Sequence, residues 1–551
     1  MINKNLKYVL ILLVLSYVCF MLGNSMVSLT NPDEVFYTQT AKEMAKYNTW
    51  MTPYLFDAPQ FEKPIFLYWF LRASLIIFPN PNFAARFSTA LFGMIGVIAV
   101  YYLALLGFKN EKKAFVSALV LMSCGLYIGL ARTVFTDMIF TVLILISLLF
   151  FYWGYTCQGR KGPGILLFFV FAGLAVLAKG PLGFLIPFLT IAAFLIIKKD
   201  IRFLFCKYSL WGILAFIGVS FPWYALMIKK YGSTFTYEFF YNDHIRRLIE
   251  AEHISNDTWY FYPFSMIGCI FPWSLYTFVS LIFLFKYLKK GVNHFYIFLA
   301  LWLGVTFLIF QPAHSKLVSY IFPLFPALAI ITGDFIYNSS LPENKSRVFF
   351  VISLVMGAIL FLMAIALFTQ IPRNSTYLPS KTPAYLLFAI LVFLTALFCF
   401  FIFRHKFLKA SFVLVVLMCS LSLLMLFILK EVETYVSSKE SSEYLLKNYT
   451  VSGPIVSSKP FARGVRYYTE KEIVVLDLPG KNYFSPHPVT FLYNDEKVKE
   501  YLRAQNQPVY CILKKANVED IERVADKEFK FTVLNKIGNE YILRIEPNKK
   551  K

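Results

Sequence analysis

The chain has few charged residues and no cysteine pattern that would mark a secreted or metal-binding domain. Charged residues make up 16% of its 551 residues and hydrophobic residues 58%, whereas about a quarter of an ordinary soluble protein is charged. The eight cysteines include no CxxC pair. Five of them lie inside apolar runs, where cysteine behaves as a small hydrophobe: Cys19, Cys124, Cys269, Cys399 and Cys419. This composition excludes an ordinary soluble enzyme and a disulfide framework.

Features of nucleic-acid binding and internal repeats are also absent from the sequence. The net charge is +22, but the lysines and arginines fall in short clusters between apolar runs, as topology determinants do. The sequence contains no zinc-ligand spacing, recognition helix or basic stripe that would read nucleic acid. The lack of a convincing repeat weighs against a secondary transporter, because many transporter folds are built from inverted repeats.

The chain instead contains a series of uncharged runs of about 18 to 22 residues, the length that crosses roughly 30 Å of hydrocarbon as a helix. Because these runs are not confined to one short N-terminal stretch, a cleaved signal peptide followed by a soluble body is excluded. The sequence predicts a polytopic α-helical membrane protein with about thirteen transmembrane helices. The expected spans are 8–28, 84–106, 114–131, 135–153, 164–178, 180–197, 208–228, 263–285, 294–311, 317–336, 348–368, 384–403 and 410–429.

The positive charges predict the orientation of these spans. If the N-terminus with Lys4 and Lys7 is cytoplasmic, every other loop that must be cytoplasmic is basic, as the positive-inside rule requires. These loops lie at 109–113, 160–161, 198–207, 286–290, 345–347 and 404–409. An odd number of spans then places 29–83, 229–262, 370–383 and everything after 430 on the outer side of the membrane.

Two domains are expected: a transmembrane catalytic domain over 1–429 and an outer soluble α/β domain over 430–551. In the outer loop 29–83, the sequence Asn31-Pro32-Asp33-Glu34 is typical of a helix start and predicts a helix on the membrane surface. The run 64–78 is too short to span and is expected to be a second interfacial or re-entrant helix.

The segment after 430 alternates short β-type runs with turn signals. The expected strands are GPIVSS, RGVRYYT, EIVVLDL, PVTFLYN, PVYCILKK, FTVLNK and EYILRIE. Helices are expected near 439–448, 495–505 and 517–528.

Several ionisable residues fall at or near the ends of the apolar runs. Asp33 and Glu34 follow the first span and could cap a helix or act as a base on an incoming hydroxyl. Asp137 lies between two spans, where an ionisable group is costly; it either pairs with Arg132 or faces a cavity. Lys179 is flanked by apolar residues and either snorkels to the surface or lines the same cavity.

Three polar runs also fall on the predicted outer side: Phe61-Glu62-Lys63-Pro64, the run 242–247 and the run 314–320. They bring cations to the face that carries Asp33 and Asp137. Each run alone is also typical of an anchor for lipid headgroups. Together the runs favour a cavity with cations for a phosphate and acids for an acceptor. The cations are Lys63, Arg246, Arg247 and Lys316.

These motifs, taken in order, resemble a known family. The runs DEVFYTQTAKEMAKYNTWMTPYL, FEKPIFLYWF, ARTVFTDMIF, LAKGPLGFLIP, FFYNDHIRRL and SKLVSYIFPLFPALAI are similar to those of bacterial aminoarabinose (lipid A) transferases and protein mannosyltransferase-like enzymes. These are C-type (GT-C) membrane glycosyltransferases that use polyprenyl-phosphate sugars. The resemblance covers essentially the whole membrane part, and RGVRYYTEKEIVVLD resembles the outer domain of the family more loosely.

The resemblance implies a GT-C fold and an inverting transfer of a sugar from a polyprenyl (undecaprenyl) phosphate donor, on the outer, periplasmic face of the bacterial inner membrane. It implies that Asp33 is the principal catalytic carboxylate and Asp137 its partner. Lys63 and Arg247 correspond to cations that hold the donor phosphate, with Tyr320 close to it and Lys179 at the cavity wall. Further expected cavity residues are Glu34, Tyr37, Glu62, Arg132, His244, Arg246 and Lys316.

The resemblance leaves a cofactor open. Glu62 matches a family position that helps to bind a metal in some members, and Asn242 or His244 would complete such a site, so no cofactor is certain and a divalent metal is possible. The chain departs from the usual DEARY pattern, because Phe36 stands where the family has arginine. The missing phosphate contact is either lost or supplied by Arg132, Arg246 or Lys316.

The chemistry of such a transfer suits these residue types. A polyprenyl phosphate leaves as an anion and needs cations rather than a general acid, whereas an acceptor hydroxyl benefits from a carboxylate base. The acceptor class stays open among lipid A, a cell-wall glycan, another lipid and a protein; no nucleic-acid partner is expected. The alternatives are a lipid or solute transporter or flippase, and a non-catalytic scaffold.

Overall fold

The computed structural model describes residues 2–250, 254–290, 293–341, 343, 346–373, 380–478, 489–525 and 528–548. The predicted cytoplasmic Lys345 and residues 374–379 of the predicted outer segment lie outside the described residues. The chain forms two compact units. The first comprises Met1–Asn24, Glu62–Leu67 and Arg86–Phe427, and the second comprises Ser25–Phe61, Tyr68–Ala85 and Ile428–Lys551.

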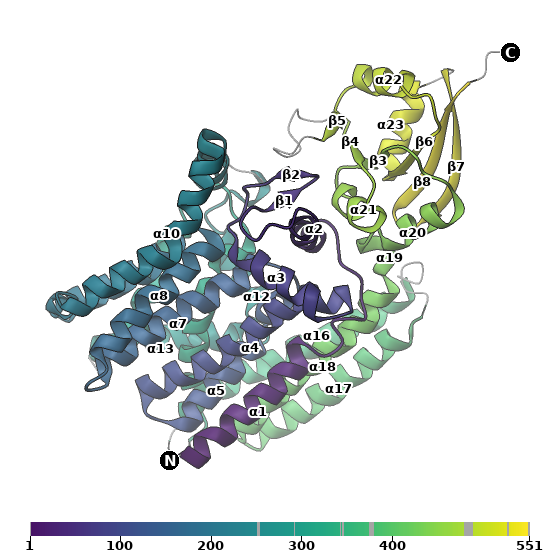
Figure 1. Ribbon diagram of the computed structural model, residues 1–551. Helices are drawn as coiled ribbons and strands as arrows, with labels where there is room; N and C mark the ends of the chain where they lie inside the picture. The colour runs from purple at the N-terminus through teal and green to yellow at the C-terminus, as the bar shows by residue number, and fades with distance from the viewer. Residues whose placement is uncertain are drawn as a thin grey trace. The chain divides into compact units, whose positions relative to one another are not determined.

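The first unit is built from helices, many of which run roughly parallel to one another (Figure 1). Over its described residues they are α1 (Ile2–Phe20), α4 (Pro81–Phe108), α5 (Glu111–Met122), α6 (Gly125–Arg132), α7 (Thr136–Thr156), α8 (Lys161–Lys179), α9 (Leu182–Ile197), α10 (Lys207–Thr236), α11 (Arg247–Ile249), α12 (Phe261–Cys269), α13 (Ser274–Lys290), α14 (His294–Phe310), α15 (Phe325–Ser339), α16 (Arg347–Arg373), α17 (Thr382–Phe403) and α18 (Phe407–Glu431). Four short helical segments join them: η1 (Ile201–Phe203), η2 (Tyr237–Arg246), η3 (Ile254–Asn256) and η4 (Val318–Leu324).

The helical segments confirm a multi-pass membrane protein. Among the described residues, eight helical stretches are long and apolar enough to cross a membrane, or nine if the bent pair α5 and α6 counts as one span. The number thirteen stays a prediction. The expected span 263–285 is two helices, because Pro272 lies in the break between α12 and α13 and has no N–H to donate. The expected span 114–131 is bent by 64° between α5 and α6.

Small residues and one buried ion pair pack these helices. A Cβ at Gly164 of α8 would lie 2.4 Å from the Cα of Gly154 in α7, so only glycine permits this close approach of the two backbones. On α5, Lys113 pairs with Asp334 of α15 at 2.6 Å, and Tyr296 of α14 donates a hydrogen bond to the same carboxylate at 2.7 Å. The carboxylate is thus satisfied although Asp334 is only 1% exposed.

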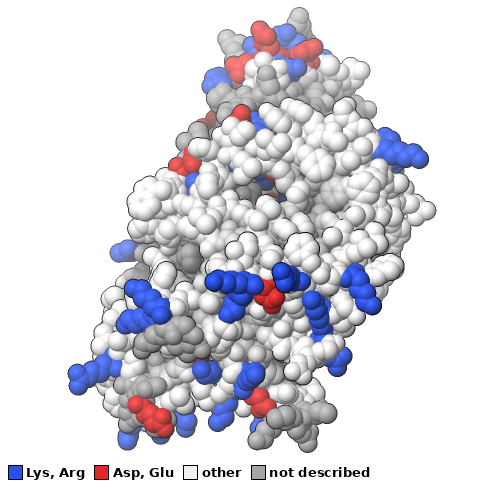
Figure 2. All heavy atoms as spheres, turned by 90° about the vertical axis from the view of Figure 1, so that its left-hand side faces the viewer, with Lys and Arg blue, Asp and Glu red and all other residues white. Residues whose placement is uncertain are grey.

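The charges on one face of the molecule are unevenly distributed (Figure 2). In Figure 2 a wide band without Lys, Arg, Asp or Glu crosses the middle of the view, and Lys and Arg side chains gather in its lower half. An uncharged band next to a basic zone is the pattern expected of a membrane-embedded surface beside cytoplasmic loops.

The second unit combines a mixed sheet with short helices. It contains α2 (Asp33–Lys46), the two-stranded hairpin β1 (Tyr54–Leu55) and β2 (Ala58–Pro59), and most of α3 (Phe66–Ile77). After α18 it contains α19 (Glu433–Val436), α20 (Lys439–Asn448), β3 (Ile455–Ser458), α21 (Ala462–Thr469), β4 (Ile473–Leu476), β5 (Thr490–Leu492), α22 (Asp495–Arg503), β6 (Val509–Leu513), α23 (Lys515–Ala525), β7 (Phe529–Ile537) and β8 (Glu540–Pro547).

The six-stranded sheet has the order β5-β4-β3-β6-β8-β7, in which β8 pairs antiparallel with β6 and β7 and the other pairs are parallel. The inner strands β3, β4 and β6 are buried along their whole length, as expected of parallel strands covered on both faces.

The predicted strand at RGVRYYT is wrong, because this run is helix α21. Its buried residues include Ala462, Val465, Arg466 and Thr469, which recur at the spacing of one helical face. The expected surface helix at the start of loop 29–83 is α2, but ten of its 14 residues are buried, so it packs inside the second unit.

Candidate functional site

In the first unit, Asp137 and Lys179 form an ion pair. Asp137 lies in the first turn of α7 and Lys179 is the last residue of α8, so each charge also complements its helix dipole. The side chains are 7% and 19% exposed. Gly180 follows with φ of 101°, and a Cβ there would lie 2.5 Å from Nε2 of His244, so glycine is required where α8 ends.

Arg132 is not the partner of Asp137. Its guanidinium donates to the main-chain carbonyls of Cys19 at 2.6 Å, Leu22 at 3.1 Å and Val18 at 3.2 Å. It also donates to the Asn24 side chain at 2.8 Å. Arg132 therefore satisfies carbonyl groups left unpaired at the C-terminal end of α1.

A second set of charged groups, here called the Asp243 cluster, consists of Lys63, Asp243, Arg247 and Tyr320. Lys63 Nζ lies 2.7 Å from one carboxylate oxygen of Asp243, and Arg247 lies 3.1 Å from the other. Arg247 also donates a hydrogen bond to the Tyr320 hydroxyl at 3.2 Å. Lys179 Nζ lies 4.8 Å from the centre of the Tyr320 ring, within the range of a cation–π contact.

The Tyr320 ring therefore joins the ion pair to the Asp243 cluster. Three cations and two carboxylates, none more than 28% exposed, meet there. These charged residues come from sequence positions as far apart as 63 and 247. Cations held in fixed geometry in this way can bind an anion.

Two main-chain hydrogen bonds bring the polar runs 242–247 and 314–320 together. The main-chain amide of Ser315 donates to the carbonyl oxygen of Arg247 at 3.1 Å. The main-chain amide of His314 donates to the carbonyl oxygen of Leu248 at 3.3 Å. Lys316 lies 3.2 Å from Asp257 and its side chain is only 5% exposed. Arg246 lies 2.8 Å from Glu250 in an exposed pair.

The residues expected to hold a metal do not form a donor cluster. His244 Nδ1 lies 2.7 Å from the carbonyl oxygen of Phe239, and Asn242 donates to Glu238 at 2.8 Å. Glu62 is half-buried, and its main-chain carbonyl accepts a hydrogen bond from Lys63 at 3.0 Å. Among the described residues, no group of three or more His, Cys, Asp or Glu could hold a metal ion.

Asp33, Glu34 and Tyr37 belong to the second unit, on the first two turns of α2. Asp33 is half-buried, whereas Glu34 is 1% exposed. The Glu34 carboxylate accepts two hydrogen bonds from Thr30, one from the main-chain amide at 3.1 Å and one from the side-chain hydroxyl at 2.9 Å. Tyr37 is buried with its ring 6.2 Å from that of Tyr68. Glu34 thus fixes the entry into α2, and Asp33 presents its carboxylate at the first helical position.

An arginine that the sequence did not suggest lies beside Phe36. The guanidinium of Arg463 in α21 stacks over the Phe36 ring at 4.4 Å. Phe36 follows Asp33 by three residues, so both side chains share one face of α2. The resembling family has an arginine on the helix at the position of Phe36. In this chain the guanidinium next to that position comes from Arg463 of α21.

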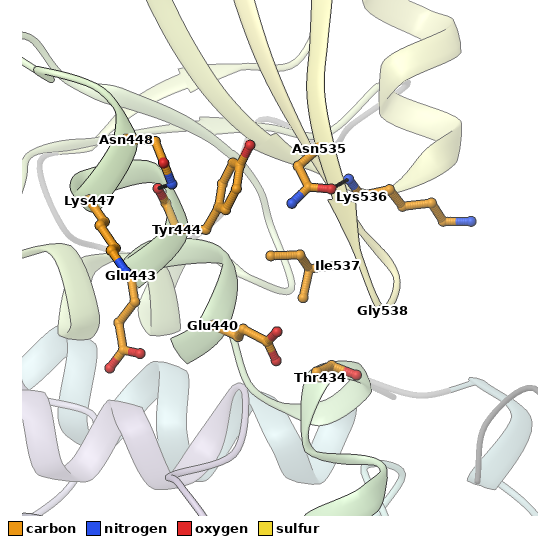
Figure 3. Close-up of a pocket in the computed structure, with 10 residues that line it drawn as sticks. All are labelled: Thr434, Glu440, Glu443, Tyr444, Lys447, Asn448, Asn535, Lys536, Ile537 and Gly538. Atoms are coloured by element: carbon orange, nitrogen blue, oxygen red, sulfur yellow. Dashed lines mark hydrogen bonds between the residues drawn. The ribbon is translucent and has the colours of Figure 1, made fainter. Parts of the chain in front are cut away.

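Two pockets of the second unit differ in their relation to α2. The pocket of Figure 3, of about 600 Å³, lies between α20 and the β7–β8 hairpin, and no expected site residue lines it. A second pocket of about 700 Å³ is lined by one face of α2, by α3 and by α21, together with the segment 79–82 and Lys439. The helix α2, which also carries Asp33, contributes four lining residues: Thr38, Ala41, Lys42 and Ala45.

The sequence matches known proteins over much of its membrane part. The family described as "Dolichyl-phosphate-mannose-protein mannosyltransferase" matches residues 62–224. The undecaprenyl phosphate-alpha-4-amino-4-deoxy-L-arabinose arabinosyl transferase of Enterobacter sp. (strain 638) is 31% identical over 340 residues, which are 60% of this chain and 59% of that protein. The protein of the same description from Photorhabdus laumondii is 28% identical over 361 residues, 64% of each chain. The matches thus span less than two thirds of these relatives.

The fold matches solved structures over nearly the whole chain. The crystal structure of ArnT from Cupriavidus metallidurans bound to undecaprenyl phosphate superposes with a TM-score of 0.78, covering 98% of each chain at 18% sequence identity. The archaeal oligosaccharyltransferase AglB from Archaeoglobus fulgidus has a TM-score of 0.52 at 11% identity, over 93% of this chain and 69% of that one. At these identities the likeness establishes the fold.

These matches confirm the resemblance predicted from the sequence: the chain is similar to aminoarabinose arabinosyl transferases and to the protein mannosyltransferase family, and it has the fold of ArnT from Cupriavidus metallidurans.

Proposed function

We propose that this chain is an integral-membrane glycosyltransferase that moves a sugar from a polyprenyl (undecaprenyl) phosphate to an envelope acceptor, with inversion, on the outer face of the inner membrane. The observation that carries the proposal is the meeting of Lys63, Arg247 and Lys179 around Asp243, Asp137 and Tyr320. Preorganised cations in a partly buried site stabilise the charge that develops on a leaving phosphate.

The donor phosphate would be held by Lys63 and Arg247. Both already contact Asp243, so an incoming phosphate can share or replace that carboxylate without moving the cations far. Tyr320 would add a hydroxyl donor, and the Lys179–Asp137 pair would form the wall beside it. The relatives named for undecaprenyl-phosphate donors support this donor class.

Asp33 would act on the acceptor. A hydroxyl is a poor nucleophile at neutral pH, and a positioned carboxylate that takes its proton contributes typically about 10² to 10⁴-fold. If the acceptor is a phosphate, as on lipid A, no strong base is required and Asp33 would orient the acceptor instead. A single displacement at the anomeric carbon inverts its configuration.

An amphiphilic acceptor fits the pocket of about 700 Å³ beside α2. Its lining combines apolar Ala45, Leu75 and Ile76 with the cations Lys42, Arg72 and Lys439 and one acid, Glu470. Ile76 is 69% exposed at the end of α3, which suits contact with lipid. A lipid acceptor with an anionic headgroup would meet both kinds of lining, and this favours lipid A or a similar lipid over a protein acceptor.

A transfer assay with purified protein tests the proposal. Undecaprenyl phosphate carrying aminoarabinose, or mannose in a parallel arm, is incubated with lipid A and the wild type or Asp33→Asn. We expect transfer by the wild type in one arm and a loss of at least about 10²-fold in the variant, because the acceptor is no longer held in position, with donor binding kept. Asp495→Asn is the matched control, because Asp495 is also the first residue of a helix, α22, but is exposed at 59%. Near-normal turnover by Asp33→Asn would remove Asp33 from the mechanism.

A further inference from the structure

A buried chain of hydrogen bonds runs from the last strand of the second unit to the turn that precedes Asp33. Ser438 donates to the Glu540 carboxylate at 2.5 Å, and the same Ser438 oxygen accepts a hydrogen bond from the Asn31 side chain at 2.7 Å. Ser438 is fully buried and Glu540 is 2% exposed. The chain thus joins residues 540, 438 and 31, all of which belong to the second unit.

The segment 28–31 makes further hydrogen bonds to the segment 433–438. The amide of Ser28 donates to Glu433 at 2.7 Å, and the amide of Asn31 donates to the carbonyl of Val436 at 2.9 Å. The carbonyl of Leu29 accepts from Ser437 at 2.8 Å. The segment that leads into α2 is therefore held at Ser28, Leu29 and Asn31 by the segment around α19.

Packing also leaves the Asn31 side chain little freedom. A Cβ on Gly464 of α21 would lie 2.0 Å from the Asn31 side-chain oxygen, so glycine at this position gives the amide its space. In a buried network of this kind each hydrogen bond fixes the orientation of the next, and partly satisfied networks are costly. Asn31 is thus confined between Ser438 on one side and α21 on the other.

We propose that Glu540 and Ser438 are positioning residues that set the location of Asp33 through Asn31. Residues of the C-terminal part of the chain then fix the backbone from which the proposed catalytic carboxylate projects. This inference rests on the proposed role of Asp33. A misplacement of about 1 Å, caused far from the chemistry, can cost about 10²-fold in rate.

The test combines transfer kinetics with hydrogen exchange of the full-length protein. Ser438→Ala and Glu540→Ala break the chain, Gly464→Ala displaces Asn31, and Glu540→Gln keeps an acceptor oxygen for Ser438. Ser452→Ala is the control, because Ser452 is an exposed serine of the same unit that contacts Gln507. Thermal unfolding of each variant confirms that it is folded at the assay temperature.

We expect the three disrupting variants to lower kcat by about tenfold to 10²-fold with the KM for the donor unchanged. Glu540→Gln and the control should keep most of the turnover. Amide exchange in peptides that cover 28–37 should be faster in Ser438→Ala than in the wild type, because the Asn31 side chain loses its hydrogen bond to Ser438 and no longer holds this segment in place. A purely structural role would lower the unfolding temperature and leave kcat per folded molecule unchanged.

Unchanged kcat together with unchanged exchange at 28–37 in Ser438→Ala would overturn the positioning role. The exchange measurement does not depend on activity. If exchange at 28–37 is faster in Ser438→Ala but the wild type transfers no sugar, the proposed function is overturned. The hydrogen-bond chain is then still established. Equal loss of kcat in Glu540→Ala and Glu540→Gln would contradict the assignment of Glu540 as an acceptor for Ser438.

Discussion

At the scale of the residue, Glu540 gives the second unit a pH-dependent stability. Burial raises the pKa of Glu540 from an ordinary value of 4.5 to about 7, against the lowering effect of hydrogen bonds from Ser438 and Ser441. The folded chain therefore holds a proton at this residue that the unfolded chain has lost between these two pH values. Stability is highest below the unfolded pKa, falls as the pH rises from about 4.5 to about 7, and then levels off.

We predict that replacing this carboxyl removes the dependence. From about pH 5 to about pH 8 the wild type should lose stability in this unit, up to about 3 kcal/mol from this residue, whereas Glu540→Gln should lose much less. Thermal unfolding monitored by hydrogen exchange of β8 peptides across the pH range measures this difference. Parallel pH profiles for the two proteins would show that Glu540 does not titrate in this window.

Single residues also show what the sequence could and could not predict. The cations Lys63, Arg247 and Lys179 stood out because charged groups beside apolar spans are costly, and the structure brings them together around Tyr320. Asp243 was passed over within its run, although its spacing of four residues from Arg247 permits an ion pair on a helix. Arg463 and Glu540 carry no local signal, because only tertiary folding brings them to Phe36 and Ser438.

At the scale of the element, α2 is held within the second unit by a buried arginine of α21. Arg466, whose side chain is 7% exposed, lies 3.5 Å from Glu43 of α2 and 2.5 Å from Asp57 of the β1–β2 hairpin. The amide of Asp57 also donates to Glu43 at 2.8 Å. Although burial opposes it, the hydrogen bonds from Lys46, Tyr47 and Arg466 hold the pKa of Asp57 below its usual range. Three elements thus share one network.

We predict that Arg466→Ala destabilises this unit by about 3 to 5 kcal/mol, because it leaves two carboxylates without their buried partner. Arg503→Ala is the matched control: Arg503 pairs with Glu528 at 2.6 Å, but both side chains are more than half exposed, so its loss should cost far less than that of Arg466. Denaturant unfolding of the two variants compares them. Equal losses would mean that Arg466 does not hold the elements together.

Elements were predictable where composition alone decides them. Uncharged runs gave the long helices, and alternating runs between turn signals gave strands β3 to β8. The strand prediction at α21 is wrong because this short run contains residues that are also common in strands, and its helical face is recognised only by what it packs against. Pro272 indicates the break between α12 and α13 in the sequence. The length of the apolar run nevertheless favours a single span over 263–285, which the structure does not have.

At the scale of the whole molecule, the basic loops predict that residues 430–551 lie on the outer side of the membrane. We predict that Lys515→Cys, at an exposed position of α23, reacts with a membrane-impermeant maleimide in intact spheroplasts. Lys109→Cys, in the loop expected to be cytoplasmic, should react only after the membrane is opened. Both are made in a chain without other reactive thiols. If Lys109→Cys is labelled in intact spheroplasts and Lys515→Cys is not, the orientation is the opposite of the predicted one.

The donor class is tested most directly by native mass spectrometry of the whole protein. The gently purified wild type is compared with Lys63→Ala and Arg247→Ala, with Arg404→Ala as a control in a loop expected to be cytoplasmic. We predict that the wild type and the control retain an undecaprenyl phosphate or its glycosylated form, and that both cation variants lose it. A wild-type protein that binds no such lipid even when it is added would contradict the proposed transferase and favour a transporter.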